Sequence, residues 1–156
     1  MQCTSMSNSE AFTGIVGYEK LISLFGYWPT FHDAEVLKIT VDRGQRGVDF
    51  APKIDVEIYL YEMTSELDEQ GNFVLKSHSK VHIQFRNIAK LQIDDFNHQN
   101  ALWGILFEHT LQDNLQFQVT FESSYGFGAE FRCCEIEVVS VIPCNCDGVS
   151  STIYHQ

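Results

Sequence analysis

Alternation of apolar and polar residues with a period of two limits the fold of this chain more than any other feature of its sequence. The alternation is clearest in four segments, at residues 37–41, 54–60, 81–85 and 115–121. Successive side chains of a β-strand point to opposite faces, so each segment predicts a strand that is buried on one side only. No long helical pattern separates the segments, which excludes a parallel sheet built from strand–helix–strand units as the leading fold. An antiparallel sheet with one buried and one solvated face is expected.

The remaining segments add further strands and one helix. Residues 17–25 place apolar side chains at helical spacing, and Gly26 suits the left-handed residue that often ends a helix. Alternation at 88–93 and at 131–142 predicts two more strands, and dense apolar residues at 101–107 favour a buried strand, with a short helix as the alternative. The predicted fold class is therefore a β-rich α+β fold, with a curved, mainly antiparallel sheet of about six or seven strands packed with a short N-terminal helix.

Length and composition point to a single domain. The chain has 156 residues, of which 44% are hydrophobic, with 12 Phe, 6 Tyr and 2 Trp. A chain of this size buries roughly two-thirds of its unfolded surface, so it needs neither a metal nor a disulfide to fold. We predict a loose N-terminal arm at residues 1–14, one domain at residues 15–143 and a polar C-terminal tail at residues 144–156.

The chain carries a large excess of negative charge. Its 21 Asp and Glu residues against 10 Lys and Arg residues give a formal net charge of −11. Residues 91–156 hold nine of the acids and a single base, Arg132, so most of the excess lies there. Nucleic acids and anionic membranes repel such a chain and are not expected as partners. The charge serves solubility, or it steers a basic protein partner toward the chain.

Four glutamates are the candidate partner-binding residues. If the strand at 115–122 forms a hairpin with the strand at 131–142, their carboxylates share one acidic surface. These residues are Glu122, Glu130, Glu135 and Glu137. A second acidic cluster lies in the charged turn expected at 61–70 and consists of Glu62, Glu66, Asp68 and Glu69. Both clusters suit a basic protein, and both also suit a surface that is only solvated.

The five cysteines predict neither a metal site nor a disulfide framework. Cys133 and Cys134 are adjacent, and Cys144 and Cys146 are one residue apart, whereas zinc ligands are usually separated by roughly two to four residues. Neighbouring residues of a strand also point to opposite faces. The N-terminal residues lack the charged and apolar regions of a secretory signal, so reduced thiols in a cytoplasmic protein are expected. No metal and no cofactor is predicted.

The densest group of polar and aromatic residues is the segment WPTFHDAE. His32 beside Asp33 and Glu35 is a combination used in acid–base or metal-dependent hydrolysis, so a small metal-dependent hydrolase is one hypothesis. In the other interpretation the segment is a structural corner, with Trp28 and Phe31 in the core and His32 hydrogen-bonded to the backbone. Adjacent side chains diverge in most backbones, which favours the structural role. No phosphate-binding or catalytic motif is present, and we predict no catalytic residue.

Three motifs resemble those of the immunity protein 50 family of bacterial polymorphic toxin systems. The first is FGYWPTFHDAEVL at residues 25–37, in which a corner leads from a short helix into the first strand. The second is FNHQNALWGI at residues 96–105, and the third is the pattern G-x-x-F-x-C-x-x-I-x-V at residues 128–138. Together the motifs extend the resemblance over residues 17–143.

The resemblance implies a small, cytoplasmic, mostly β protein that binds and neutralises a cognate protein toxin. It carries over no catalytic residues, and the chain is expected not to be an enzyme. We expect it to block the toxin by occluding the toxin's active surface. Many toxins of such systems are nucleases with basic substrate channels, so an acidic surface would speed docking.

Overall fold

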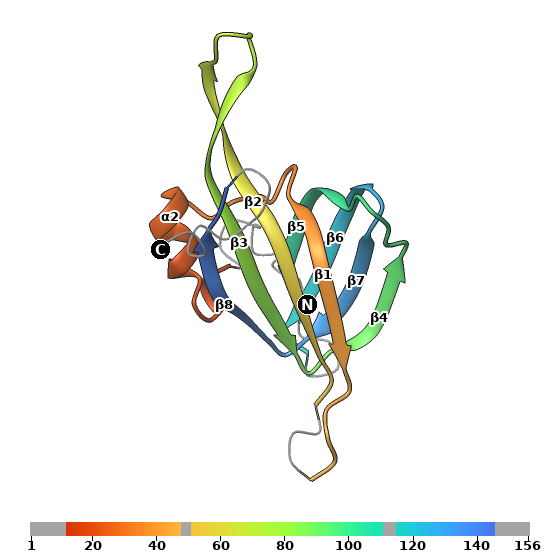
Figure 1. The fold of residues 1–156 in the computed structure, drawn as a ribbon. Coiled ribbons are helices and arrows are strands. Elements are labelled where there is room, and N and C mark those ends of the chain that lie inside the picture. Colours follow the sequence, from red (N-terminus) through yellow and green to blue (C-terminus); the bar gives the residue numbers. More distant parts are fainter. Residues whose placement is uncertain (1–11, 48–50, 111–114, 146–156) are drawn as a thin grey trace, which may run out of the picture.

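Eight strands form one antiparallel sheet in the computed structural model, which describes residues 12–47, 51–110 and 115–145 (Figure 1). The strands are β1 (Glu35–Asp42), β2 (Lys53–Leu67), β3 (Phe73–Arg86), β4 (Ala89–Asp94), β5 (Ala101–His109), β6 (Phe117–Tyr125), β7 (Gly128–Cys133) and β8 (Glu135–Pro143). Their order across the sheet is β4-β7-β6-β5-β1-β2-β3-β8. The predicted β-rich, antiparallel fold is confirmed, whereas the expected six or seven strands are too few. The ambiguous segment at 101–107 lies in strand β5.

The extra strand comes from residues 131–142, which the alternation predicts as one strand. β7 and β8 instead pair with different strands, β6 and β3. Cys134 lies at the bend between them, and its N–H donates to the carbonyl of Arg86 at 3.1 Å. Alternation restarts there, because Cys133 and Ile136 are both buried although the two residues are an odd number of positions, three, apart. The predicted hairpin between the strands at 115–122 and 131–142 is therefore wrong for its second half, since β8 lies at the far edge of the sheet.

The sheet folds on itself, so that its two halves face each other across the core (Figure 1). One half holds β1, β2, β3 and β8, and the other holds β4, β5, β6 and β7. The seam between them is short, since the register of β1 with β5 consists of Glu35 opposite Ala101. Phe85 of β3 meets Phe131 of β7 edge to face, with ring centroids 4.9 Å apart. Such ring contacts across the halves close the core.

The predicted helix is present as α2 (Glu19–Phe25), preceded by the 3-10 turn η1 (Phe12–Gly14). Leu21 and Phe25 are buried, and the helix lies beside β8 (Figure 1). Gly26 has a φ of 82° and its N–H donates to the carbonyl of Ile22, as expected for a left-handed helix end. Neither helix of the described residues is long and apolar enough to cross a membrane.

The predicted domain limits remain a prediction. The N-terminal arm at residues 1–14 lies outside the described residues apart from η1, and the C-terminal tail at 144–156 lies outside them apart from its first two residues.

Candidate functional site

The segment WPTFHDAE is the corner through which the chain crosses the seam of the sheet. The carbonyl of Thr30 accepts from the N–H of Ile105 at 3.2 Å. Leu102 makes two further bonds, since its carbonyl accepts from Asp33 at 3.0 Å and its N–H donates to Ala34 at 2.9 Å. These three bonds attach the corner to β5 where β1 and β5 barely pair.

Two residues of the corner adopt the left-handed backbone region that non-glycine residues rarely occupy. Phe31 has a φ of 66° and Asp33 a φ of 63°. Each such conformation costs on the order of 1 kcal/mol, so packing must hold the corner in place. Phe31 is 1% exposed, and Trp28 lies edge-on against Phe31 and Phe107 with centroids 5.8 and 5.7 Å away. These rings anchor the inner side of the corner.

Gly104 lets the corner lie this close to β5. A Cβ atom at this position would lie 3.0 Å from the carbonyl oxygen of Thr30. That separation is shorter than an ordinary van der Waals contact, so a larger residue would push the two segments apart.

Asn100 is a buried residue that the sequence interpretation did not single out. It is 3% exposed, and its Oδ1 accepts from the N–H groups of Asn97 at 3.0 Å and Phe127 at 3.1 Å. Its Nδ2 donates to the carbonyls of Asn97 at 2.8 Å and Val36 at 3.3 Å. One amide thus connects the turn before β5, the start of β1 and the β6–β7 turn. The available signal was its place at the end of the F-N-x-Q-N motif, directly before a run of apolar residues.

The outer side of the corner presents an aromatic ring to solvent in a defined orientation. The Nδ1–H of His32 donates to the carbonyl of Trp103 at 3.1 Å, and the two rings stack with centroids 5.6 Å apart. Asp33 Oδ2 lies 3.5 Å from His32 Nε2. Trp103 is 58% exposed. The indole is therefore held on one side by the imidazole while much of its surface stays open.

Two tyrosines and two carboxylates extend this surface toward β2. Burial raises the pKa of Tyr27, and the charge of Glu62 and its hydrogen bond to the tyrosine hydroxyl raise it further. Burial also raises the pKa of Tyr61, with a smaller contribution from the charge of Asp33. The Tyr27 hydroxyl is therefore bonded to one carboxylate near the corner, and Tyr61 lies close enough to another to feel its charge.

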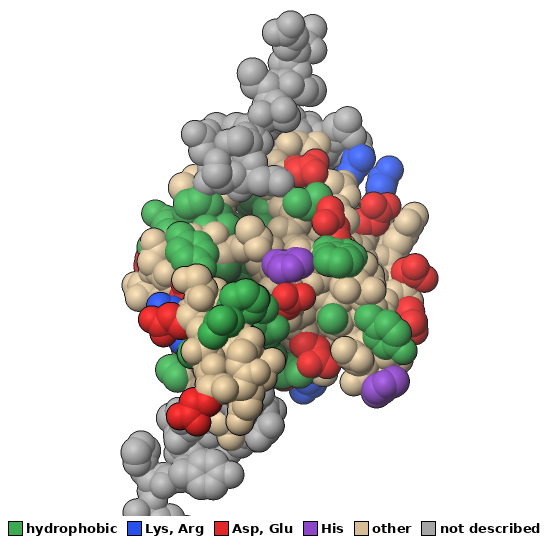
Figure 2. All heavy atoms as spheres, turned by 90° about the horizontal axis from the view of Figure 1, so that it is seen from above, with side chains coloured by type: hydrophobic (Ala, Val, Ile, Leu, Met, Phe, Trp, Pro, Cys, Tyr) green, Lys and Arg blue, Asp and Glu red, His purple; other side chains and the backbone are tan. Residues whose placement is uncertain are grey.

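We refer to the whole surface as the corner face. It consists of Tyr27, His32, Asp33, Tyr61, Glu62, Trp103 and Glu122. Figure 2 shows this end of the molecule, where acidic and apolar or aromatic side chains surround a central His and the Lys and Arg side chains lie toward the periphery. The corner face is thus both aromatic and acidic.

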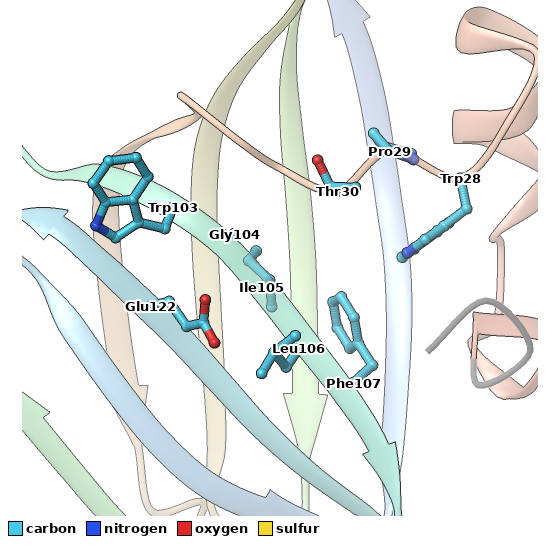
Figure 3. A pocket seen from close by; sticks show the side chains of 9 residues that line it. All are labelled: Trp28, Pro29, Thr30, Trp103, Gly104, Ile105, Leu106, Phe107 and Glu122. Carbon is cyan, nitrogen blue, oxygen red and sulfur yellow. The ribbon is translucent and has the colours of Figure 1, made fainter. Parts of the chain in front are cut away.

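A shallow pocket of about 330 Å³ opens beside the corner, between the corner and the outer surfaces of β5 and β6 (Figure 3). Its lining consists of Trp28, Pro29, Thr30, Trp103, Gly104, Ile105, Leu106, Phe107 and Glu122. Among these nine residues, Glu122 alone is charged. The pocket therefore suits an apolar or aromatic group that carries a positive charge at one end.

At the corner, the structure does not bring together the three side chains of the hydrolase hypothesis as a metal-binding group. His32 and Asp33 are neighbours on the surface, and Glu35 lies in β1. Within the described parts of the chain, no three His, Cys, Asp or Glu side chains gather closely enough to hold a metal ion. The geometry gives the hydrolase hypothesis no support.

The four candidate glutamates do not form one surface. Glu122 and Glu130 lie on the neighbouring strands β6 and β7, on the face opposite the buried Phe121 and Ala129. Glu135 and Glu137 lie on β8 in the other half of the sheet. Each accepts a hydrogen bond of 2.9 Å from the guanidinium of Arg86, and these two bonds raise the pKa of the arginine. The single positive charge of Arg86 therefore offsets about half of the charge of the second pair.

Cys133 also differs from its expected place. The alternation puts its side chain on the face of Glu135 and Glu137, but the side chain is fully buried. Burial, together with the nearby Cys134, raises its pKa to about 12. The thiol is thus a core group and stays protonated at neutral pH.

The fold and the site define a small β protein with one folded sheet, whose most developed surface is an open, aromatic and acidic face. The chain belongs to the immunity protein 50 family, whose family model matches residues 17–144. No curated protein and no solved structure gives a significant match. Membership of this family indicates an immunity protein of a toxin system, with a toxin as its partner and a role other than catalysis.

Proposed function

We propose that this immunity protein neutralises its cognate toxin in the cytoplasm by covering a basic active surface of the toxin with the corner face. The observation that carries the proposal is the exposed Trp103 ring, held by His32 and bordered by Asp33 and Glu122. An indole next to carboxylates matches the chemistry of arginine and lysine side chains, which bind the ring face and the carboxylate together. A nuclease with a basic substrate channel would present such side chains.

The rigidity of the corner supports binding as its role. His32 orients the indole, and the backbone bonds to β5 hold the corner itself. A ring that is already ordered loses little conformational freedom on binding, which increases affinity. Aromatic side chains of this kind dominate the binding energy of many protein interfaces.

The overall charge supports association with a basic partner. The net charge of −11 attracts a positively charged protein over long distances and accelerates encounter, most strongly at low salt. Of the four candidate glutamates, Glu122 lines the pocket and Glu130 lies on the same outer face. We propose this pair as the stronger contributors, because Glu135 and Glu137 are paired with Arg86.

The test first identifies a toxin gene next to the gene of this protein and then measures binding to the catalytically inactivated toxin module of that gene. Glu122→Lys is expected to slow association several-fold at low salt, and Trp103→Ala to speed dissociation, because charge acts on encounter and desolvated contacts act on release. Glu19→Lys is the matched control, since Glu19 is exposed on α2, which lies beside β8 and not on the outer face of β5 and β6. Rates of both corner variants equal to those of the control would refute this surface assignment.

The same assay separates the two pairs of glutamates. Glu130→Lys is expected to slow association, whereas the double variant Glu135→Lys, Glu137→Lys is expected to have the smaller effect once its folding has been verified by thermal unfolding. The reverse ranking would place the docking surface on β8. Protection of cells that express the active toxin module reports on neutralisation itself.

A further inference from the structure

The hairpin of β2 and β3 continues beyond the sheet as a two-stranded arm, which projects from the body in Figure 1. β1 begins opposite Tyr59, and β8 ends opposite Ser79. Beyond these points the described register pairs β2 and β3 only with each other, as far as Leu67 opposite Phe73. We refer to residues 62–76 as the arm.

One face of the arm is apolar and exposed. Met63 lies opposite Leu75, and Leu67 lies opposite Phe73, with a shift of register between the two pairs. Phe73 and Leu75 are two residues apart on β3, so both pairs lie on the same face of the arm. They are 51%, 38%, 60% and 54% exposed, in the same order. An isolated two-stranded hairpin is only marginally stable in water, and a contiguous exposed apolar patch commonly marks a binding surface.

The charges of the arm indicate what covers this apolar face. Its acidic residues are Glu62, Glu66, Asp68 and Glu69. Its basic residue is Lys76, which lies 3.8 Å from Glu62. A second copy of the chain would bring two acidic arms together, and like charges disfavour that contact. A partner with an apolar groove bordered by basic side chains fits both the apolar face of the arm and the acidic residues around it.

The arm begins beside the corner face. The hydroxyl of Tyr27 hydrogen-bonds to Glu62 at the start of the arm, and Tyr61 lies near Asp33 of the corner. The aromatic ring of Tyr61 also contacts His78 of β3, with centroids 5.9 Å apart. The corner face therefore adjoins the base of the arm, and the arm projects away from the body of the molecule (Figure 1).

We infer that the arm is a second docking element for the same basic partner, in which the stripe of Met63, Leu67, Phe73 and Leu75 enters an apolar groove while the corner face contacts its basic surface. The inference rests on the proposed function. The two elements have different physical roles: the acidic corner face acts on encounter, and the apolar stripe acts on release.

The test uses the full chain and the same inactivated toxin module. The double variant Leu67→Ser, Phe73→Ser removes the outer half of the stripe and leaves the core intact. We expect it to weaken binding roughly tenfold or more, mainly through faster dissociation and with little dependence on salt. The matched control is Val16→Ser, Val41→Ser, which removes two other exposed apolar side chains outside the arm and is expected to bind like the unmodified chain. Thermal unfolding checks that both variants are folded.

The outcomes distinguish the inference from the proposed function. Binding of the arm variant within twofold of the unmodified chain, with Glu122→Lys impaired, would overturn the arm and leave the corner face standing. Failure of the unmodified chain to bind the module would refute the proposed function and the arm together. Concentration-dependent dimerisation in sedimentation, abolished by Leu67→Ser, Phe73→Ser, would assign the stripe to a second copy and overturn the inference.

Discussion

Replacement of Asn100 by alanine is expected to lower the stability of this protein by an amount that the hydrogen bonds of the side chain determine. The side chain makes four hydrogen bonds, two through Oδ1 and two through Nδ2, from a position that is 3% exposed. A hydrogen bond contributes about 1 kcal/mol net, and a buried group left without a partner costs about 1–3 kcal/mol. Water that enters the vacated space restores part of the loss. We therefore expect Asn100→Ala to lower the free energy of unfolding by about 2–4 kcal/mol.

Urea unfolding followed by circular dichroism measures this loss. For a domain of this size, each kcal/mol lowers Tm by about 2–4 °C, so the variant is expected to melt roughly 4–16 °C earlier with an unchanged dependence on urea. Gln99→Ala is the control, because Gln99 is an exposed residue of the same turn and its loss is expected to cost less than about 0.5 kcal/mol. Equal effects of the two substitutions would refute the role assigned to Asn100.

Asn100→Asp tests the polarity of the same site with little change in shape. The carboxylate keeps both acceptor contacts but turns an acceptor toward the carbonyls of Asn97 and Val36. At pH 7 we expect the free energy of unfolding to fall at least as much as in Asn100→Ala. As the pH falls, the carboxyl group regains a proton that it can donate, and part of the lost stability is expected to return.

Three further predictions follow from individual contacts. Gly104→Ala places a Cβ 3.0 Å from the carbonyl oxygen of Thr30, so we expect the free energy of unfolding to fall by about 1–2 kcal/mol and the fluorescence of Trp103 to change as the corner moves away from β5. Stability and fluorescence equal to those of the unmodified chain would contradict the packing argument. Burial raises the pKa of Cys133 to about 12, so above pH 9 the unfolded chain releases the thiol proton while the folded chain keeps it, and the free energy of unfolding falls by about 1 kcal/mol at pH 10. In urea unfolding between pH 8 and 10.5, the free energy of unfolding of a Cys133→Ala variant is expected to fall less steeply with pH. Arg86→Gln removes the two ion pairs that hold β8 to β3, so we expect a loss of about 1 kcal/mol in dilute buffer that shrinks in 1 M salt, where a salt-independent loss would indicate packing instead.

Much of the fold could be predicted because its signals are local. The helix at α2 was visible from the spacing of its apolar residues and from Gly26, and the strands from their alternation. The prediction of a single last strand was wrong because no glycine or proline in the sequence of residues 131–142 marks the bend at Cys134. The bend is held by a bond to Arg86, 48 residues earlier in the chain, which no local pattern reports.

The site was predicted only in part. The corner was visible as a dense motif, but Trp103 and Asn100 belong to a different segment and meet the corner only through the folded seam. The acidic turn at 61–70 was visible too, whereas the apolar stripe on the arm was not. Its four side chains come from two separate segments, at 63–67 and 73–75, which only the strand pairing brings together, and the early ends of β1 and β8 leave them uncovered.

The sequence by itself determined where most of the strands lie and that one face of most of them is buried, because alternation is a property of neighbouring residues. It also determined the net charge of −11. Tertiary structure decided which strands pair, because hydrogen bonding between strands is open to any extended segment. It thereby decided how the carboxylates are paired: Glu135 and Glu137 share the single positive charge of Arg86, while Glu122 lines the pocket beside Trp103.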